Sequence, residues 1–166
     1  MEQMAGLASL VLDGALERHP RLRVALLESG SGWIPYWLER LDSHVEWMRG
    51  TETGHLTLAP SEYFERQCVV ATETEDSLVG VVIARYGAER VVWASDFPHP
   101  DGLYPDAVAT FLDGIAKTGL DPGDVTKVLW DTPLRFYGLE RRFGEGRKAP
   151  RHAAVARESG VPDASR

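Results

Sequence analysis

The sequence predicts an α/β fold in which parallel strands alternate with helices, and three observations lead to this class. Apolar runs without polar interruption recur along the chain, which is typical of strands buried on both faces of a parallel sheet. Between them lie segments with apolar residues at helical spacing. The loops are short, which favours right-handed parallel crossovers. A chain of 166 residues suits one compact domain.

The first half of the chain contains one strand between two helices. Apolar residues at helical spacing predict a helix from Met4 that stops before Pro20. Leu22–Glu28 contains an unbroken apolar run and is predicted to be a buried strand. Ile34–Arg49 has an apolar stripe along one face and is predicted to be the second helix.

The second half repeats the alternation of strand and helix. Capping residues, glycines and prolines mark the helix ends. The predicted elements are a short helix at Ser61–Arg66, a strand at Gln67–Thr72, a helix capped by Asp76 or Ser77 and ended by Gly87, a strand at Arg90–Ala94, and helices from Pro105 to Lys117 and from Pro122 to Leu129.

Composition and charge exclude several classes of protein. The chain has a net charge of −7, so it lacks the basic surface that binding to nucleic acid needs. Cys68 is the single cysteine and has no disulfide partner within the chain. The longest aliphatic run, Val79–Ala84, is far shorter than the roughly 20 residues of a membrane span. We therefore expect a cytoplasmic protein with no membrane or nucleic-acid partner.

The C-terminal segment differs in composition from the rest of the chain. Residues 141–166 have a net charge of +4, against −11 for residues 1–140. The segment is poor in large apolar residues, so burial would not offset the entropy of ordering it. We expect a folded part at 1–140 and a disordered basic tail at 141–166. A weak helix at Arg151–Glu158 and a basic docking arm are the alternatives for this tail.

An acidic residue stands at or just beyond the end of each predicted strand: Glu28, Glu73 and Asp96. In parallel α/β folds, functional groups gather at the carboxyl ends of the strands. A carboxylate there binds a metal, accepts a proton or caps the next helix. Capping or solvation explains any one of them taken alone, whereas three in succession favour a functional site.

Two loops of unusual composition follow predicted strands. Gly30-Ser31-Gly32 suggests a phosphate-binding loop, but the dinucleotide and Walker patterns are incomplete, so a tight turn is the simpler interpretation. The loop Ser95–Gly102 is rich in proline and contains Asp96, His99 and Asp101. It is either a rigid functional site or a rigid turn with an exposed histidine.

The other histidines give no sign of a metal site. His19 fits a helix end, while His44, His55 and His152 are expected to be solvated. The sequence has no His-x-His, no His-Glu-x-x-His and no pair of cysteines, so it does not predict a self-contained zinc site.

Three stretches together resemble the amidohydrolase-related family of metal-dependent TIM-barrel hydrolases and decarboxylases. The stretches read LRVALLESGSGWIPYW at 22–37, VWASDFPHPDG at 92–102 and WDTPLRFYGL at 130–139, and the likeness as a whole extends over about residues 1–140. The resemblance departs at Thr132, where family members commonly have Asn. It implies that the three predicted strands are the sixth, seventh and eighth of a (β/α)8 barrel.

The resemblance also implies roles for the strand-end acids. The aspartate matching Asp96 binds metal or handles the proton of the attacking water, while Glu28 stands where decarboxylase-like relatives have a catalytic His. We therefore predict Asp96 and Glu28 as catalytic residues, with Asp96 also a metal ligand. His99, Trp33 and Glu73 are the candidate substrate-binding residues. The implied cofactor is a divalent metal, zinc or manganese.

A barrel of this kind needs roughly 250 residues, more than this chain offers, and the histidine ligands on its first and fifth strands have no counterpart here. The chain therefore reads as a C-terminal portion, inactive alone, that forms homo-oligomers or binds a complementing N-terminal half. Open sheet edges and one uncovered face would leave Val24, Leu26, Val69 and Val92 partly exposed. The alternative is a non-catalytic half-barrel with a structural or partner-binding role.

Overall fold

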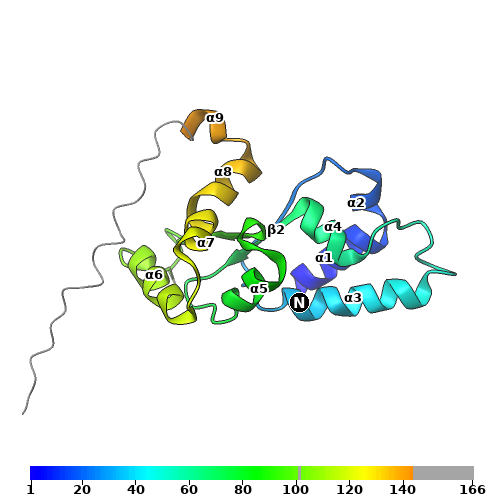
Figure 1. Ribbon diagram of the computed structural model, residues 1–166, viewed down its shortest axis with the longest axis horizontal. Helices are drawn as coiled ribbons and strands as arrows, with labels where there is room; N and C mark the ends of the chain where they lie inside the picture. The colour runs from blue at the N-terminus through cyan, green and yellow to red at the C-terminus, as the bar shows by residue number, and fades with distance from the viewer. Residues whose placement is uncertain (101, 144–166) are drawn as a thin grey trace, which may run out of the picture.

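A computed structural model describes residues 1–100 and 102–143, and a parallel β-sheet lies at the centre of this part of the chain (Figure 1). Its strands are β1 (Val24–Leu26), β2 (Cys68–Thr72) and β3 (Val91–Trp93), in the order β1-β2-β3. Both pairs are parallel. The predicted α/β class with parallel strands is confirmed, although β1 and β3 are shorter than the sequence predicted.

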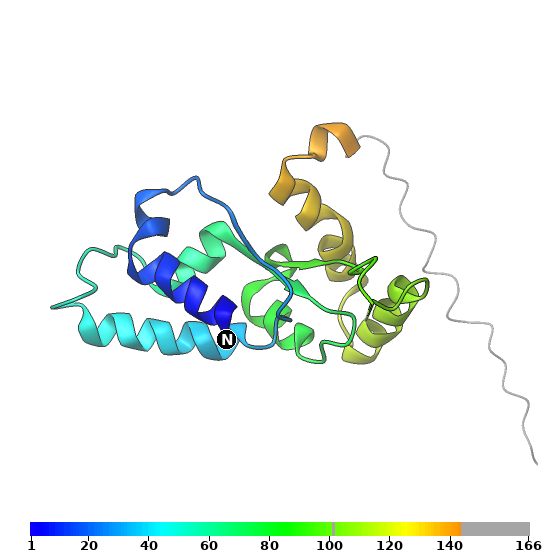
Figure 2. The same cartoon turned by 180° about the vertical axis from the view of Figure 1, so that it is seen from behind.

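The helices of the first half pack together at one end of the molecule. They are α1 (Glu2–Leu12), α2 (Ala15–Arg18), α3 (Ile34–Met48) and α4 (Pro60–Gln67). In both views α1 and α3 lie side by side (Figure 2). The prediction of a single helix from Met4 that stops before Pro20 is wrong, because Gly14 has a left-handed backbone (φ 74°) that separates α1 from α2.

The second half begins as predicted but continues further. Helix α5 (Val79–Tyr86) ends at Gly87 and is followed by the 3₁₀ turn η1 (Ala88–Arg90), and α6 (Ala107–Thr118) comes after β3. Helix α7 (Pro122–Thr126) then runs through a π-helical turn η2 (Lys127–Asp131) into α8 (Thr132–Tyr137). Neither α8 nor the short α9 (Glu140–Phe143) was predicted.

The larger core lies on one face of the sheet. Leu26, Cys68, Val70 and Val91 of the strands pack there against apolar residues of helices α1 to α6. Alternate strand residues point to opposite faces. This face is therefore the one that the amphipathic helices cover, as their apolar stripes predict.

The second face of the sheet is also covered, which corrects an expectation from the sequence. Val69, Ala71 and Val92 form a smaller cluster with Phe136 of α8. In both views α8 lies across the sheet from α5. The partial exposure expected for Leu26, Val69 and Val92 is wrong, since all three are buried at 3%, 3% and 7% exposure; only Val24 is half-buried. No pattern in the sequence predicted that α8 would fold over this face.

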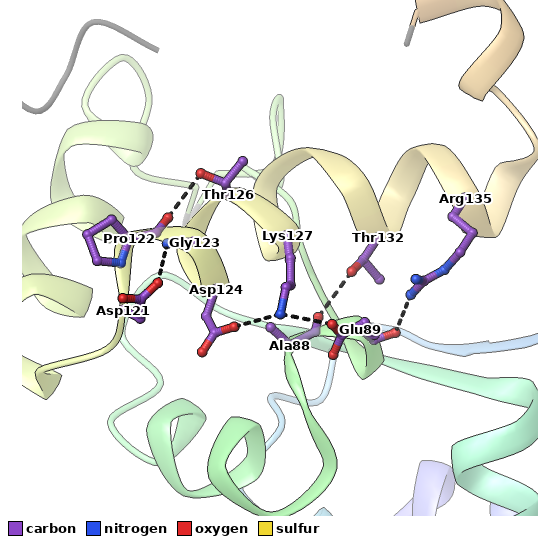
Figure 3. A network of polar contacts seen from close by, with 10 residues as sticks. All are labelled: Ala88, Glu89, Asp121, Pro122, Gly123, Asp124, Thr126, Lys127, Thr132 and Arg135. Atoms are coloured by element: carbon purple, nitrogen blue, oxygen red, sulfur yellow. Dashed lines mark hydrogen bonds and ion pairs between the residues drawn. The ribbon is translucent and has the colours of Figure 1, made fainter. Parts of the chain in front are cut away.

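A polar network holds η2 and α8 against the turn that precedes β3 (Figure 3). Lys127 Nζ lies 2.9 Å from Glu89 Oε1 and 3.0 Å from Asp124 Oδ1. Two further hydrogen bonds join the same elements: Thr132 Oγ1 donates to the Ala88 carbonyl at 3.1 Å, and Arg135 Nη2 donates to the Glu89 carbonyl at 3.1 Å. This network fixes the helix that supplies Phe136 to the second face.

Several sequence-based expectations fall on residues that the structure does not describe. Asp101, His152 and the suggested helix at 151–158 lie outside the described residues, as does the basic tail apart from residues 141–143 of α9. Within residues 1–100 and 102–143, none of the helices has the length and apolar character to cross a membrane.

We expect Glu89→Gln to reduce the sensitivity of the fold to acid. The hydrogen bond from Lys127 holds the pKa of Glu89 below its ordinary value of 4.5. A carboxyl whose folded pKa is lowered adds stability that is complete above the unfolded pKa and is lost as the pH falls through the folded pKa. Thermal unfolding of wild type and variant, from neutral pH into the acid range, measures this difference.

Glu52→Gln, at an exposed loop position, is the control for that experiment and should follow the wild-type profile. Melting temperatures that fall with pH in the same way for wild type and Glu89→Gln would mean that the Lys127 ion pair adds nothing to stability.

Candidate active site

The three strand-end acids lie at one edge of the sheet. Glu28 is two residues beyond β1, Glu73 directly follows β2, and Asp96 is three residues beyond β3. The strands are parallel, so their carboxyl ends meet at the same edge, and all three acids are exposed there. Since β2 lies between the other two strands, Glu28 and Asp96 belong to strands about 10 Å apart.

Glu28 and Asp96 share an unusual backbone conformation. Their φ angles are 58° and 56°, and in the described residues no other residue apart from glycine has a positive φ. This left-handed region is uncommon for residues with a side chain and is found more often at functional sites. Both residues therefore mark sharp turns where the chain leaves the sheet edge.

The loop after β3 brings Asp96 and His99 together. Asp96 Oδ2 lies 3.4 Å from His99 Nδ1, and the two side chains are 53% and 60% exposed. The His99 amide donates to the Asp96 carbonyl at 2.8 Å, and the Gly102 amide donates to the His99 carbonyl at 3.0 Å. A Cβ at Gly102 would lie 3.1 Å from both of these carbonyl oxygens, so the tight loop favours glycine there. The interpretation as a tight turn with an exposed histidine is confirmed, and the turn places Asp96 beside that histidine; the functional role of the loop stays a prediction.

The Gly30-Ser31-Gly32 segment is a tight turn whose amides bind the chain's own carboxylates. The Gly30 amide donates to Glu73 Oε1 at 3.1 Å, and the Ser31 amide donates to Asp76 Oδ2 at 2.7 Å. Leu78 closes the turn on its other side, because a Cβ at Gly32 would lie 2.7 Å from Leu78 Cδ1. The phosphate-loop alternative is therefore not supported, since acids of the β2 loop hold these amides.

Trp33 points back into its own loop. Its indole Nε1 donates to the Gly30 carbonyl at 2.9 Å and to Ser29 Oγ at 3.3 Å. The ring is half-buried and packs against the main core. Trp33 thus supports the turn after β1, and its predicted contact with substrate stays a prediction.

The described residues do not fit a metal ion by themselves. Within residues 1–100 and 102–143, no group of three or more His, Cys, Asp or Glu side chains is placed to hold one. Asp96 and His99 offer two donors, whereas a catalytic zinc takes three protein ligands. Burial raises the pKa of the Cys68 thiol to about 12, so the thiol stays protonated at neutral pH.

Sequence reasoning missed the main polar contact of this edge. It treated Asp76 only as a possible helix cap, yet Asp76 Oδ2 also accepts the Ser31 hydroxyl at 2.6 Å and the Thr72 hydroxyl at 3.3 Å. Ser31 and Thr72 are fully buried polar residues, so both need a hydrogen-bond partner. A threonine at the end of an apolar strand needs an acceptor for its hydroxyl, and an aspartate stands four residues later. This pattern could have indicated the contact of Thr72 with Asp76.

A parallel sheet with acids and a histidine at its carboxyl edge defines an α/β protein, and this edge is where α/β folds commonly carry their ligand-binding groups. The amidohydrolase family model matches residues 1–139, and the chain therefore belongs to the amidohydrolase family. The resemblance stated from the sequence is confirmed. No curated protein is significantly similar to the chain.

Solved structures share the fold. An amidohydrolase from Mycobacterium avium subsp. paratuberculosis K-10 is 25% identical with a TM-score of 0.65, over 80% of this chain and 32% of its own. The 5-carboxyvanillate decarboxylase from Sphingomonas paucimobilis is 27% identical with a TM-score of 0.63, over 81% and 39%. A manganese-bound dihydroxybenzoic acid decarboxylase from Polaromonas sp. JS666 is 21% identical with a TM-score of 0.63, over 83% and 40%. The chain thus spans about a third to two fifths of these proteins.

The donor set predicts weak metal binding by the isolated chain. After loading with zinc or manganese and dialysis, we expect less than one ion per chain, because Asp96 and His99 supply only two ligands. Elemental analysis of wild type and Asp96→Asn measures this. Stoichiometric metal held with sub-micromolar affinity by wild type and lost in the variant would contradict the prediction and place a complete site at Asp96.

Proposed function

We propose that this chain forms one side of the active site of a metal-dependent amidohydrolase-type enzyme, which hydrolyses C–N or C–O bonds or decarboxylates a small molecule. Its strands would be the last three of a (β/α)8 barrel. The observation that supports this most is the pair Glu28 and Asp96, which turn away from the same sheet edge with the same left-handed backbone. Family membership supports the reaction class.

In this proposal Asp96 moves the proton. Its exposed carboxylate is free of backbone capping contacts in the described residues and lies beside His99, whose ring at 3.4 Å orients it. In hydrolysis such a carboxylate takes the proton of the attacking water; in decarboxylation the group starts as the protonated carboxylic acid and gives its proton to the carbon that loses carbon dioxide, which leaves it as a carboxylate. Glu28 is the second proton-handling group, while His99, Trp33 and Glu73 contact the substrate.

The cofactor in this proposal is a divalent metal, zinc or manganese, to which Asp96 adds one ligand. The other ligands would come from outside the described residues, since those residues do not complete a site. The shared fold of the manganese-bound Polaromonas decarboxylase supports the choice of metal. The chain alone would therefore be inactive and would work with a complementing half.

Complementation tests this function. We expect the chain, combined with the part of the Sphingomonas decarboxylase that the match does not cover, to release carbon dioxide from 5-carboxyvanillate when manganese is present. Asp96→Asn should abolish this activity, because the amide keeps the shape but loses the charge and basicity. Glu28→Gln should reduce it. Glu75→Gln, an exposed acid of the next loop, is the control.

Two results would argue against the proposal. Turnover by Asp96→Asn within about tenfold of wild type, which is about 1.4 kcal/mol in the barrier, would remove Asp96 from the catalytic role. An assembled but inactive complex, verified by size-exclusion chromatography, would favour a structural or partner-binding role for the chain.

Association through the sheet edges is a separate expectation. In the described sheet, β1 and β3 each pair with β2 on one side only. Unpaired strand edges bind other strands. We expect sedimentation velocity over a wide concentration range to show self-association of the chain, or a defined complex once the complementing half is added. A chain that sediments as a monomer at all concentrations, and that forms no complex when the complementing half is added, would contradict this.

A further inference from the structure

The loop after β2, residues 73–78, bonds to both neighbouring strand ends. On the β1 side, Glu73 and Asp76 accept the amides of Gly30 and Ser31. On the β3 side, Thr74 Oγ1 accepts Trp93 Nε1 at 3.3 Å, and the Trp93 ring stacks on Phe111 with centroids 5.0 Å apart. The strands that precede Glu28 and Asp96 are therefore tied to one loop.

Asp76 makes most of these contacts. Its Oδ2 accepts the Ser31 amide at 2.7 Å, the Ser31 hydroxyl at 2.6 Å and the Thr72 hydroxyl at 3.3 Å. Its Oδ1 accepts the Leu78 amide at 3.0 Å just before α5. The Leu78 bond alone would make Asp76 a helix cap. The bonds to Ser31, which lies 45 residues away in the sequence, go beyond capping and join two loops of the candidate site.

The contact between Asp76 and Ser31 is close to Glu28. Ser31 is three residues after Glu28 and is fully buried. Its buried polar groups need hydrogen-bond partners, and Asp76 supplies them, so Asp76 determines where Ser31 lies. The intervening turn includes Gly30, whose φ is 61°. The same turn receives the Trp33 indole at the Gly30 carbonyl. A change at Asp76 would therefore alter the turn that sets the direction of Glu28.

We infer that Asp76 is a positioning residue for this site: it clamps the turn after β1 to the loop after β2 and so sets where Glu28 lies relative to Asp96. Its catalytic meaning rests on the function proposed above, but the clamp itself exists in the isolated chain. Charged acceptors bond more strongly to amides and hydroxyls than neutral acceptors do. Replacing the carboxylate by an amide therefore weakens the clamp without changing its size.

Nuclear magnetic resonance of the isolated chain tests the clamp without any activity. The indole signal of Trp33 reports on the turn, because that indole bonds to the Gly30 carbonyl. We expect Asp76→Asn to shift the Trp33 indole signal and the Gly30 and Ser31 amide signals. Hydrogen exchange at the Ser31 amide should speed up about tenfold or more, since its charged acceptor is gone.

Asp42→Asn is the matched control. Asp42 Oδ1 accepts the Ser61 amide at 2.8 Å and joins α3 to α4, so the variant also removes a carboxylate that bridges two elements. It should lower stability yet leave the Trp33 indole signal in place. The Trp37 indole, which donates to the Met4 carbonyl at 2.8 Å, is the internal reference and should stay unchanged in both variants.

Ser31→Ala guards against an Asp76 variant that fails to fold. It removes the hydroxyl bond and keeps the amide bond, so it should give a smaller shift of the Trp33 signal in the same direction. If Asp76→Asn and Ser31→Ala both leave the Trp33, Gly30 and Ser31 signals as Asp42→Asn leaves them, the clamp does not exist and the inference is wrong.

The catalytic meaning is tested separately in the complemented enzyme. There Asp76→Asn should lower kcat more than it changes KM, because it displaces Glu28, a proton-handling group, while the side chains that contact the substrate are all still present. Altered resonances with unchanged kcat would overturn the positioning role and leave Asp76 as a structural clamp. A complemented enzyme that is inactive as wild type refutes the proposed function instead, and the resonances of the isolated chain still decide on the clamp.

Discussion

Burial of β2 on both of its faces is the constraint around which the rest of the molecule is arranged. All five of its residues are buried: Cys68 and Val70 face the helical core, while Val69 and Ala71 face Phe136. A strand with no wet face needs neighbours at both edges and cover above and below. The last residue, Thr72, is buried with a hydroxyl that requires an acceptor. Asp76 supplies that acceptor, so the packing of the sheet extends directly into the polar contacts of its carboxyl edge.

Much of this arrangement was predictable because burial on two faces leaves a clear pattern. The apolar runs located all three strands, and the stripe on Ile34–Met48 located α3 almost to the residue. The break at Gly14 was not predicted, because the apolar spacing continues across it and only the left-handed backbone ends α1. Helix α8 was missed for another reason. It is six residues long, so it has little apolar periodicity of its own. Its packing depends on the contact of Phe136 with strands that are distant in sequence.

In the candidate site too, features set by local sequence were predictable, and contacts between residues distant in sequence were not. Acids at the ends of apolar runs can be recognised in the sequence, so Glu28, Glu73 and Asp96 were located from their positions relative to the predicted strands alone. The pairing of Ser31 with Asp76 depends on the register of β1 against β2, which places residues 45 apart in sequence side by side. No local pattern encodes that register. For the same reason, the sequence did not decide whether Gly30-Ser31-Gly32 is an anion-binding loop or a turn. The structure shows that its amides donate to carboxylates of the loop after β2.

Under the proposed function, the left-handed backbone at Glu28 and Asp96 sets the stability of the fold against the chemistry of the site. A residue with a side chain held in that region costs about 1 kcal/mol or more, and glycine or asparagine would relieve much of it. Selection for a more stable fold alone would therefore replace the acids at these two turns, Glu28 before Asp96, because aspartate tolerates the left-handed region better than glutamate does. Redesign of this chain for stability should keep both acids, which the proposed function requires. It should change positions in the helices instead, where substitutions leave the edge of the sheet as it is.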